Sequence, residues 1–170
     1  MGQETTRQTR VQVAEGSGRP AGWDVGSLSF AGALRAAPSR SPRVEASVAP
    51  AVRYKLDEAF RLAATAVREQ PACSGLFARL GTHGEEALSG TVYGGGGEVG
   101  ACLREAPAFT CVGCRRTTLC PVFSRLDAAA SATVLIHEAL HFAGLKERPA
   151  YPGAMSATEI TDMVERSCRL

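Results

Sequence analysis

One stretch of the chain reads Leu135-Ile136-His137-Glu138-Ala139-Leu140-His141-Phe142-Ala143-Gly144-Leu145-Lys146-Glu147 and contains the pattern HExxH. Residues four apart lie one above the other on an α-helix, so His137 and His141 can point both imidazoles at one ion. Glu138 is offset by one position and can reach a water molecule beside that ion. The pattern therefore predicts a Zn2+ site with two histidine ligands and Glu138 as general base.

The residues around the motif are apolar on nearly every side, which is typical of a helix buried inside a domain. Asp127 is a candidate N-cap and Gly144 a candidate C′ residue, which predicts a helix of about seventeen residues. Because burying two histidines and a glutamate without partners is costly, we expect these side chains to be hydrogen-bonded or bound to metal. The alternative is a chance match on a helix whose histidines make ordinary hydrogen bonds.

A catalytic zinc ion usually takes three protein ligands and leaves a fourth position for water. Glu147 is the first candidate for the third ligand, because Gly144 can take a left-handed conformation, end the helix and turn the chain back towards the ion. Glu159 is the competing candidate, eighteen residues after His141 and near the start of a later helix. The same Glu159 also fits the last position of a capping box, and Glu147 can be a solvent-exposed loop residue.

The pattern His137-Glu138-x-x-His141-x-x-Gly144-x-x-Glu147 resembles the metzincin signature, with glutamate where that clan has histidine or sometimes aspartate. Ala154-Met155-Ser156 is similar to the methionine turn of that clan, and Tyr151 stands where a flanking tyrosine reaches the cleft. The resemblance covers about Thr133 to Ser156 and implies a zinc metallopeptidase. With Glu159 as third ligand, the chain instead resembles the gluzincins, whose third ligand comes from a downstream helix.

We therefore expect a zinc-dependent hydrolase that cleaves peptide bonds in a peptide or protein substrate. Zinc lowers the pKa of water towards 7 and polarises the scissile carbonyl, while Glu138 takes the proton and passes it to the leaving amine. Tyr151 and His83 are candidates for stabilising the oxyanion, although His83 reads more simply as an exposed loop residue. The alternatives are a hydrolase acting on cell-wall peptides or small molecules, a catalytically inactive metal-binding protein, and a cysteine-stapled binding protein.

Length and composition set further limits on the protein. A chain of 170 residues suits one domain with its own core. The net charge of +2 and the lack of a basic block argue against a nucleic-acid partner. No apolar run approaches about eighteen residues, so we expect no membrane span.

The six cysteines predict a disulfide framework in an oxidising compartment, hence a secreted or periplasmic protein. Met1 to Arg19 nevertheless lacks the apolar segment of a secretory signal. The CxxC pattern from Cys111 to Cys114 is interpreted as a disulfide rather than a redox motif or a structural zinc site. Cys168 is expected to point inward and to pair with a cysteine of the β segment, with Cys120 as the guess among fifteen possible pairings.

The chain divides by composition into two parts. Residues 1–50 are rich in Arg, Ser, Gly, Pro and Ala and are expected to form a disordered arm or linker, in which 23–34 is a candidate short strand. Whether this arm is a pro-segment stays open. Residues 51–170 form the expected metallopeptidase-like domain, which begins with an amphipathic helix over 51–70 ended by Pro71.

The sequence pattern of residues 51–170 predicts an α+β fold, with a small sheet, the buried HExxH helix and a C-terminal helix. Thr91 to Tyr93 is β-prone, and the segments 108–112 and 117–123 are expected to form a hairpin. The segment 95–100 formally matches the GxGxxG pattern of dinucleotide-binding sites. We reject that interpretation because no full strand precedes the segment and no βαβ unit surrounds it. Ser156 to Glu159 is a capping box that predicts the start of the last helix.

Overall fold

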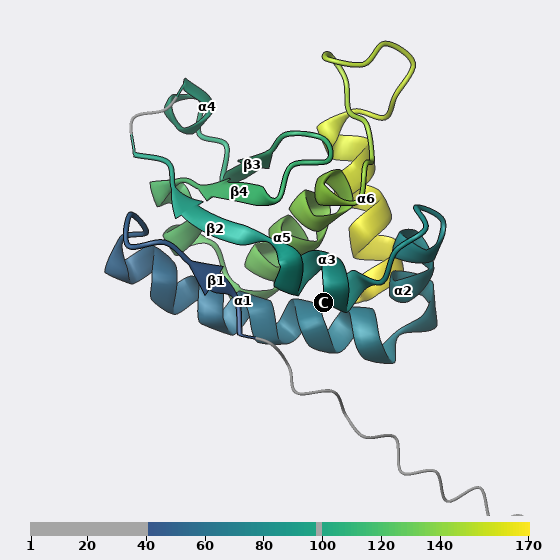
Figure 1. Ribbon diagram of the computed structural model, residues 1–170, viewed down its shortest axis with the longest axis horizontal. Coiled ribbons are helices and arrows are strands. Elements are labelled where there is room, and N and C mark those ends of the chain that lie inside the picture. The colour runs from purple at the N-terminus through teal and green to yellow at the C-terminus, as the bar shows by residue number, and fades with distance from the viewer. Residues whose placement is uncertain (1–40, 98–99) are drawn as a thin grey trace, which may run out of the picture. The chain divides into compact units, whose positions relative to one another are not determined.

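The computed structural model describes residues 41–97 and 100–170, and the statements below concern these residues (Figure 1). They form six α-helices and a four-stranded mixed sheet, which confirms the predicted α+β class. The candidate strand at 23–34 lies outside the described residues, as does the expected arm up to residue 40. No helix of the described part is long and apolar enough to cross a membrane.

The sheet has the strand order β1-β2-β4-β3, where the strands are Arg43–Val44, Val92–Gly95, Arg116–Leu119 and Ala108–Thr110 in that spatial order. Strands β1, β2 and β4 are parallel, whereas β3 runs antiparallel to β4. The expected hairpin is therefore confirmed, with Phe109 opposite Thr118. Strand β3 lies at an edge of the sheet, and no other strand of the described residues pairs with its outer side.

The second half of the expected hairpin ends earlier than the sequence predicted. Strand β4 stops at Leu119, and Pro121–Arg125 forms a 3-10 helix, η1, instead of extending the strand to residue 123. Proline has no N–H for a strand ladder but fits the first position of a helical turn. Pro121 occupies that position in η1.

Residues 41–49 also differ from the expected arm over 1–50. Strand β1 pairs with β2, and the amide of Glu45 donates to the carbonyl of Tyr93 at 2.9 Å. Val48 follows and is buried in the core. A strand of two residues is too short to show a period of alternation, so it could not be predicted from the sequence pattern.

Helix α1, Pro50–Glu69, is the expected amphipathic helix and it ends before Pro71 as predicted. Its buried face is formed by Val52, Leu56, Ala59, Phe60, Ala63, Ala64, Ala66 and Val67. Three shorter helices follow: α2 at Pro71–Ala78, α3 at Gly84–Gly90 and α4 at Gly100–Leu103. His83 is exposed and occupies the N-cap position of α3.

Helix α5, Ala128–Phe142, carries the HExxH motif through the middle of the domain. It packs against α1, α3, α6 and strand β3, and ten of its fifteen residues are buried (Figure 1). The Asp127 side chain accepts a hydrogen bond from the amide of Ala130 at 2.7 Å, so the predicted N-cap is confirmed. The prediction of a helix buried on most sides is confirmed too.

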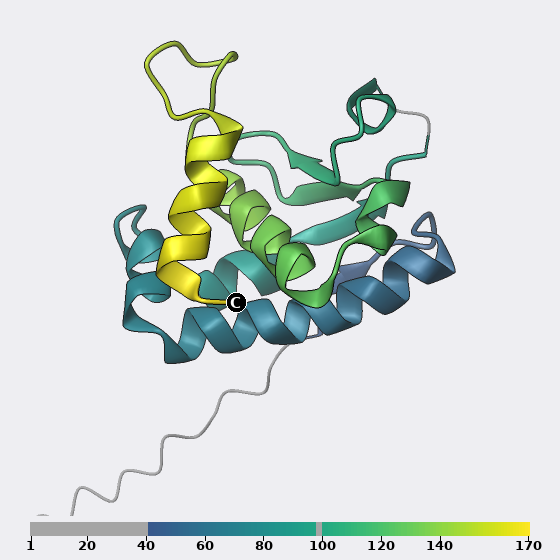
Figure 2. The same cartoon turned by 180° about the vertical axis from the view of Figure 1, so that it is seen from behind.

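Helix α6, Ala157–Cys168, begins with the predicted capping box between Ser156 and Glu159. Its buried residues are Ile160, Val164 and Cys168, and the helix packs against α5 and α2 (Figure 2). The stretch 143–156 that joins α5 to α6 is a loop stabilised by its own backbone hydrogen bonds. The two helices of the HExxH region are thereby fixed against each other.

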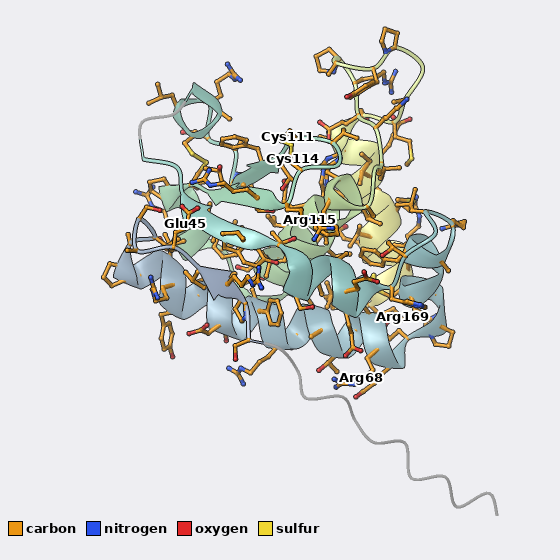
Figure 3. All side chains as sticks on the ribbon, viewed as in Figure 1. Glu45, Arg68, Cys111, Cys114, Arg115 and Arg169 are labelled. Atoms are coloured by element: carbon orange, nitrogen blue, oxygen red, sulfur yellow. A yellow bond between two sulfur atoms is a disulfide. The ribbon has the colours of Figure 1, made fainter. Side chains whose placement is uncertain are left out.

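All six cysteines form disulfides, but the guessed pairing of Cys168 with Cys120 is wrong. Cys168 is fully buried as predicted, yet it bonds Cys73, because the end of α6 packs against α2. Cys120, at the end of β4, bonds Cys102 of α4 instead. Cys111 and Cys114 bond each other across the turn between β3 and β4, so both form a disulfide as expected, in a pairing that the sequence left open (Figure 3).

The glycines after Tyr93 serve close packing. The short strand β2, Val92–Gly95, includes the first two of these glycines. A Cβ atom on Gly95 would collide with the carbonyl of Ser47, and one on Gly96 with the sulfur of Cys102. Helix α4, which follows, has only four residues. The glycines are thus explained by backbone and disulfide contacts.

Candidate metal centre

Three side chains converge on one point at the C-terminal end of α5. The Nε2 atoms of His137 and His141 lie 3.1 Å apart, and Oε2 of Glu147 lies 3.1 Å from the first and 3.0 Å from the second. Both histidines are buried, with 8 % and 5 % of their surface exposed. This group could hold a metal ion, as the HExxH spacing and the Gly144 turn predicted.

The histidines share one face of α5 because they are four residues apart on a regular helix. Glu147 reaches the same point through the glycine turn that ends the helix. Gly144 has a φ of 99°, its amide donates to the carbonyl of His141, and the amide of Leu145 donates to Leu140. These two hydrogen bonds form a Schellman cap, which reverses the chain just before the third side chain.

The outer nitrogen of each imidazole has a partner. Nδ1 of His141 lies 2.8 Å from the carbonyl oxygen of Leu145, and Nδ1 of His137 lies 3.1 Å from Oγ1 of Thr161 on α6. A carbonyl oxygen only accepts hydrogen bonds, so Nδ1 of His141 carries the proton and its Nε2 presents a lone pair. Partners of this kind orient ligating histidines in metal sites.

The chemistry of the three atoms fits a cation. The lone pair of His141 and the carboxylate oxygen of Glu147 are both acceptors, yet they face each other at 3.0 Å. A proton or a metal ion placed between these atoms removes the conflict between the two acceptors. Tetrahedral ligand atoms 2.0–2.1 Å from zinc lie about 3.3 Å apart, close to the distances found here.

Glu138 is buried beside this group without belonging to it. Only 7 % of its surface is exposed, and its Oε2 atom has no hydrogen-bond partner among the described residues. The pKa of the Glu138 carboxyl is raised to about 7, mainly by burial and also by the charge of Glu147, although His141 and Thr110 act to lower it. A buried acceptor without a partner is costly, so this oxygen is suited to receive a proton or a water molecule.

Burial also acts on the first histidine. It lowers the pKa of His137, and the neighbouring His141 lowers it further, whereas Glu147 raises it. The neutral imidazole is thus favoured, which is the form that binds metal ions.

A cleft of about 610 Å³ opens in front of the group. Its walls come from edge strand β3 and the turn after it, from α5, from the loop 147–151 and from the start of α6. His137, Glu138, His141 and Glu147 all line it. Most of its remaining lining is apolar, contributed by Pro107, Phe109, Val112, Val134, Pro149 and Ala157.

The structure brings some of the predicted residues together and leaves others apart. Glu159 does not join the metal group: its Oε2 accepts from the amide and hydroxyl of Ser156 and from Arg148. His83 lies on α3 and is absent from the lining of the cleft. Tyr151 lines the cleft. Met155 packs against the core, and its backbone pairs with that of Glu147.

Two partners of the site were missed by the sequence analysis. Thr161 had no local signal, because its contact with His137 depends on how α6 packs against α5, and the two residues are 24 positions apart in the sequence. The carbonyl of Leu145 had no signal, since every residue carries a carbonyl and only the turn at Gly144 aims this one.

No family model matches the chain, and neither a curated protein nor a solved structure matches it.

Proposed function

We propose that the protein is a zinc-dependent hydrolase that cleaves peptide bonds. The observation that carries the proposal is the convergence of His137, His141 and Glu147 within 3.1 Å of one another, with Glu138 buried beside them in one cleft. Two nitrogens and one carboxylate are a ligand set typical of catalytic zinc, in which a fourth position stays open. The cleft provides access to that position.

Zinc supplies Lewis-acid chemistry at such a site: it lowers the pKa of water and polarises a carbonyl group. Glu138 would accept the proton of the attacking water and deliver it to the leaving amine. Its unpartnered Oε2 supports this role, because the atom faces no competing donor in the described residues. Tyr151, on the wall of the cleft, is the proposed donor to the developing oxyanion.

Within this proposal the centre is metzincin-like. The support is local: a helix with two histidines, a glycine with positive φ after it, and a third side chain delivered three residues later. Glu159 is occupied by its cap and by Arg148, which disfavours the gluzincin-like alternative.

The three disulfides suggest an oxidising extracellular environment. We therefore propose that the protein acts in a secreted or periplasmic setting, on a peptide or protein substrate. The apolar walls of the cleft favour substrates with apolar side chains near the scissile bond.

The competing function is a metal-binding protein without catalysis. Glu138 argues against it, because a non-catalytic site gains nothing from a buried carboxylate that binds no metal and lacks a full set of partners. A cysteine-stapled binding protein in which HExxH is incidental is the other alternative. Neither alternative predicts that Glu138 is needed for turnover.

The deciding experiment measures bound zinc and peptide cleavage in the wild type, Glu138→Ala and His141→Ala. We expect one zinc per chain in the wild type and in Glu138→Ala, none in His141→Ala, and cleavage of a mixed peptide library by the wild type alone. A folded wild type that takes up no added zinc would make the motif incidental. Zinc binding without any cleavage would favour the non-catalytic alternative.

A further inference from the structure

The two histidines of the metal centre have different kinds of partner. His141 faces a backbone carbonyl, that of Leu145, which can only accept a hydrogen bond. His137 faces the hydroxyl of Thr161, which can donate or accept. The first imidazole is therefore restricted to one tautomer, and the second is not.

In the metal-free protein, two acceptors face Nε2 of His137. They are Nε2 of His141 and Oε2 of Glu147, each at 3.1 Å. A neutral imidazole has one proton, and placing it on Nε2 of His137 satisfies both acceptors at once. Nδ1 is then a lone pair, so the Thr161 hydroxyl donates to it.

Metal binding requires the opposite arrangement. Nε2 of His137 must then present its lone pair to the ion, so the single proton moves to Nδ1. The Thr161 oxygen accepts from that N–H after its hydroxyl hydrogen has rotated. The proton count of the imidazole is unchanged, and the ring keeps its position.

We propose that Thr161 is a positioning residue whose hydroxyl holds the His137 ring in both tautomers, so that the ring is already oriented when the metal ion arrives. The inference rests on the metal site of the proposed function and deepens it. It assigns to α6, which contributes no ligand, the orientation of one of the three ligands.

The position of Thr161 is itself well fixed. It lies one residue after the buried Ile160, close to the capping box that starts α6. The other end of the helix is joined to α2 by the disulfide between Cys168 and Cys73. Because the backbone at Thr161 is held in place, a hydrogen bond to its hydroxyl restricts the orientation of the His137 ring.

The test compares the zinc affinity of the wild type with three variants, measured by competition with a chromophoric chelator. Thr161→Val keeps the shape but loses the hydroxyl, Thr161→Ser keeps the hydroxyl, and Thr158→Val makes the same change at an exposed position of α6. We expect about 10–100-fold weaker binding for Thr161→Val, as found for lost partners of ligating histidines. Thr161→Ser and Thr158→Val should bind zinc as the wild type does.

A spectroscopic readout separates orientation from general packing. Nitrogen NMR of labelled histidine reports which ring nitrogen carries the proton, and we expect His137 to change from Nε2–H to Nδ1–H on zinc addition. Equal zinc affinity in Thr161→Val and wild type, or a His137 proton on Nδ1 in both states, would overturn the inference. Because neither readout uses turnover, a protein that binds zinc but cleaves nothing would defeat the proposed function and leave this inference standing.

Discussion

Nδ1 of His141 lies 2.8 Å from the carbonyl oxygen of Leu145, so a candidate metal ligand is hydrogen-bonded to the backbone just beyond its own helix. The amide of the same Leu145 closes the helix cap on Leu140. The orientation of the imidazole and the path of the chain towards Glu147 thus depend on one turn. Gly144 is the residue that makes this turn possible.

Gly144→Ala should weaken both the fold and the metal site. A Cβ atom at this position meets nothing within 4 Å, so the cost comes from the φ of 99° alone and should be about 1–2 kcal/mol. We expect a lower melting temperature and weaker zinc binding, measured by thermal unfolding and chelator competition. Gly153→Ala is the matched control, since Gly153 has a φ of 82° and open space in the same loop but does not precede Glu147. Equal zinc affinity in the two variants would contradict the role of the turn.

Glu147→Ala and Glu159→Ala should separate the two candidates for the third ligand. Removing Glu147 takes away one of the three converging atoms, and we expect zinc to be lost on dialysis. Removing Glu159 takes away a helix cap and the bond to Arg148, so we expect a lower melting temperature with zinc retained. Metal analysis by mass spectrometry decides the matter, and a zinc-loaded Glu147→Ala protein would refute our assignment.

The local parts of this structure could be predicted from the sequence. The ends of α5 depend on Asp127 and Gly144, and the start of α6 depends on Ser156 and Glu159, all of which act within a few residues. The candidate metal group is local in the same way, because the eleven residues from His137 to Glu147 carry all three side chains. A helix period and one glycine turn were enough to bring them together.

The parts that depend on distant contacts could not be predicted. Cys73 and Cys168 are 95 residues apart, and only the packing of α6 on α2 makes them neighbours. Strand β1 exists because β2 offers it a parallel edge, and its two residues show no pattern of their own. Thr161 reaches His137 across 24 residues, by the crossing of two helices whose relative position no local signal gives.

The ion pair and cap at Glu159 should make the fold sensitive to acid. The pKa of the Glu159 carboxyl is lowered to about 2 by hydrogen bonds from the amide and hydroxyl of Ser156 and from Arg148, whereas it is about 4.3 in an unfolded chain. The stabilisation is therefore complete above pH 4.3 or so and is lost as the pH falls towards about 2. In the metal-free protein, the difference in melting temperature between wild type and Glu159→Gln should shrink across that interval. Glu165→Gln, an exposed change on the same helix, is the control, and a constant difference would contradict the assignment.

The Cys111–Cys114 disulfide should be the first to open under a limiting amount of a dithiol reductant. Exchange requires that a thiolate reach the sulfur, and Cys111 is exposed whereas Cys73, Cys120 and Cys168 are fully buried. Alkylation followed by peptide mass spectrometry should find the first labels on Cys111 and Cys114, with all six cysteines labelled in denatured protein. The fold should survive, because a bridge that spans 3 residues restricts the unfolded chain less than one that spans 95.

The amide of Gly113 donates to the carbonyl of His141 at 2.8 Å, so opening this turn should also loosen the end of α5 and weaken zinc binding. First labels on Cys73 or Cys168 would mean that the end of α6 is more accessible than its burial indicates.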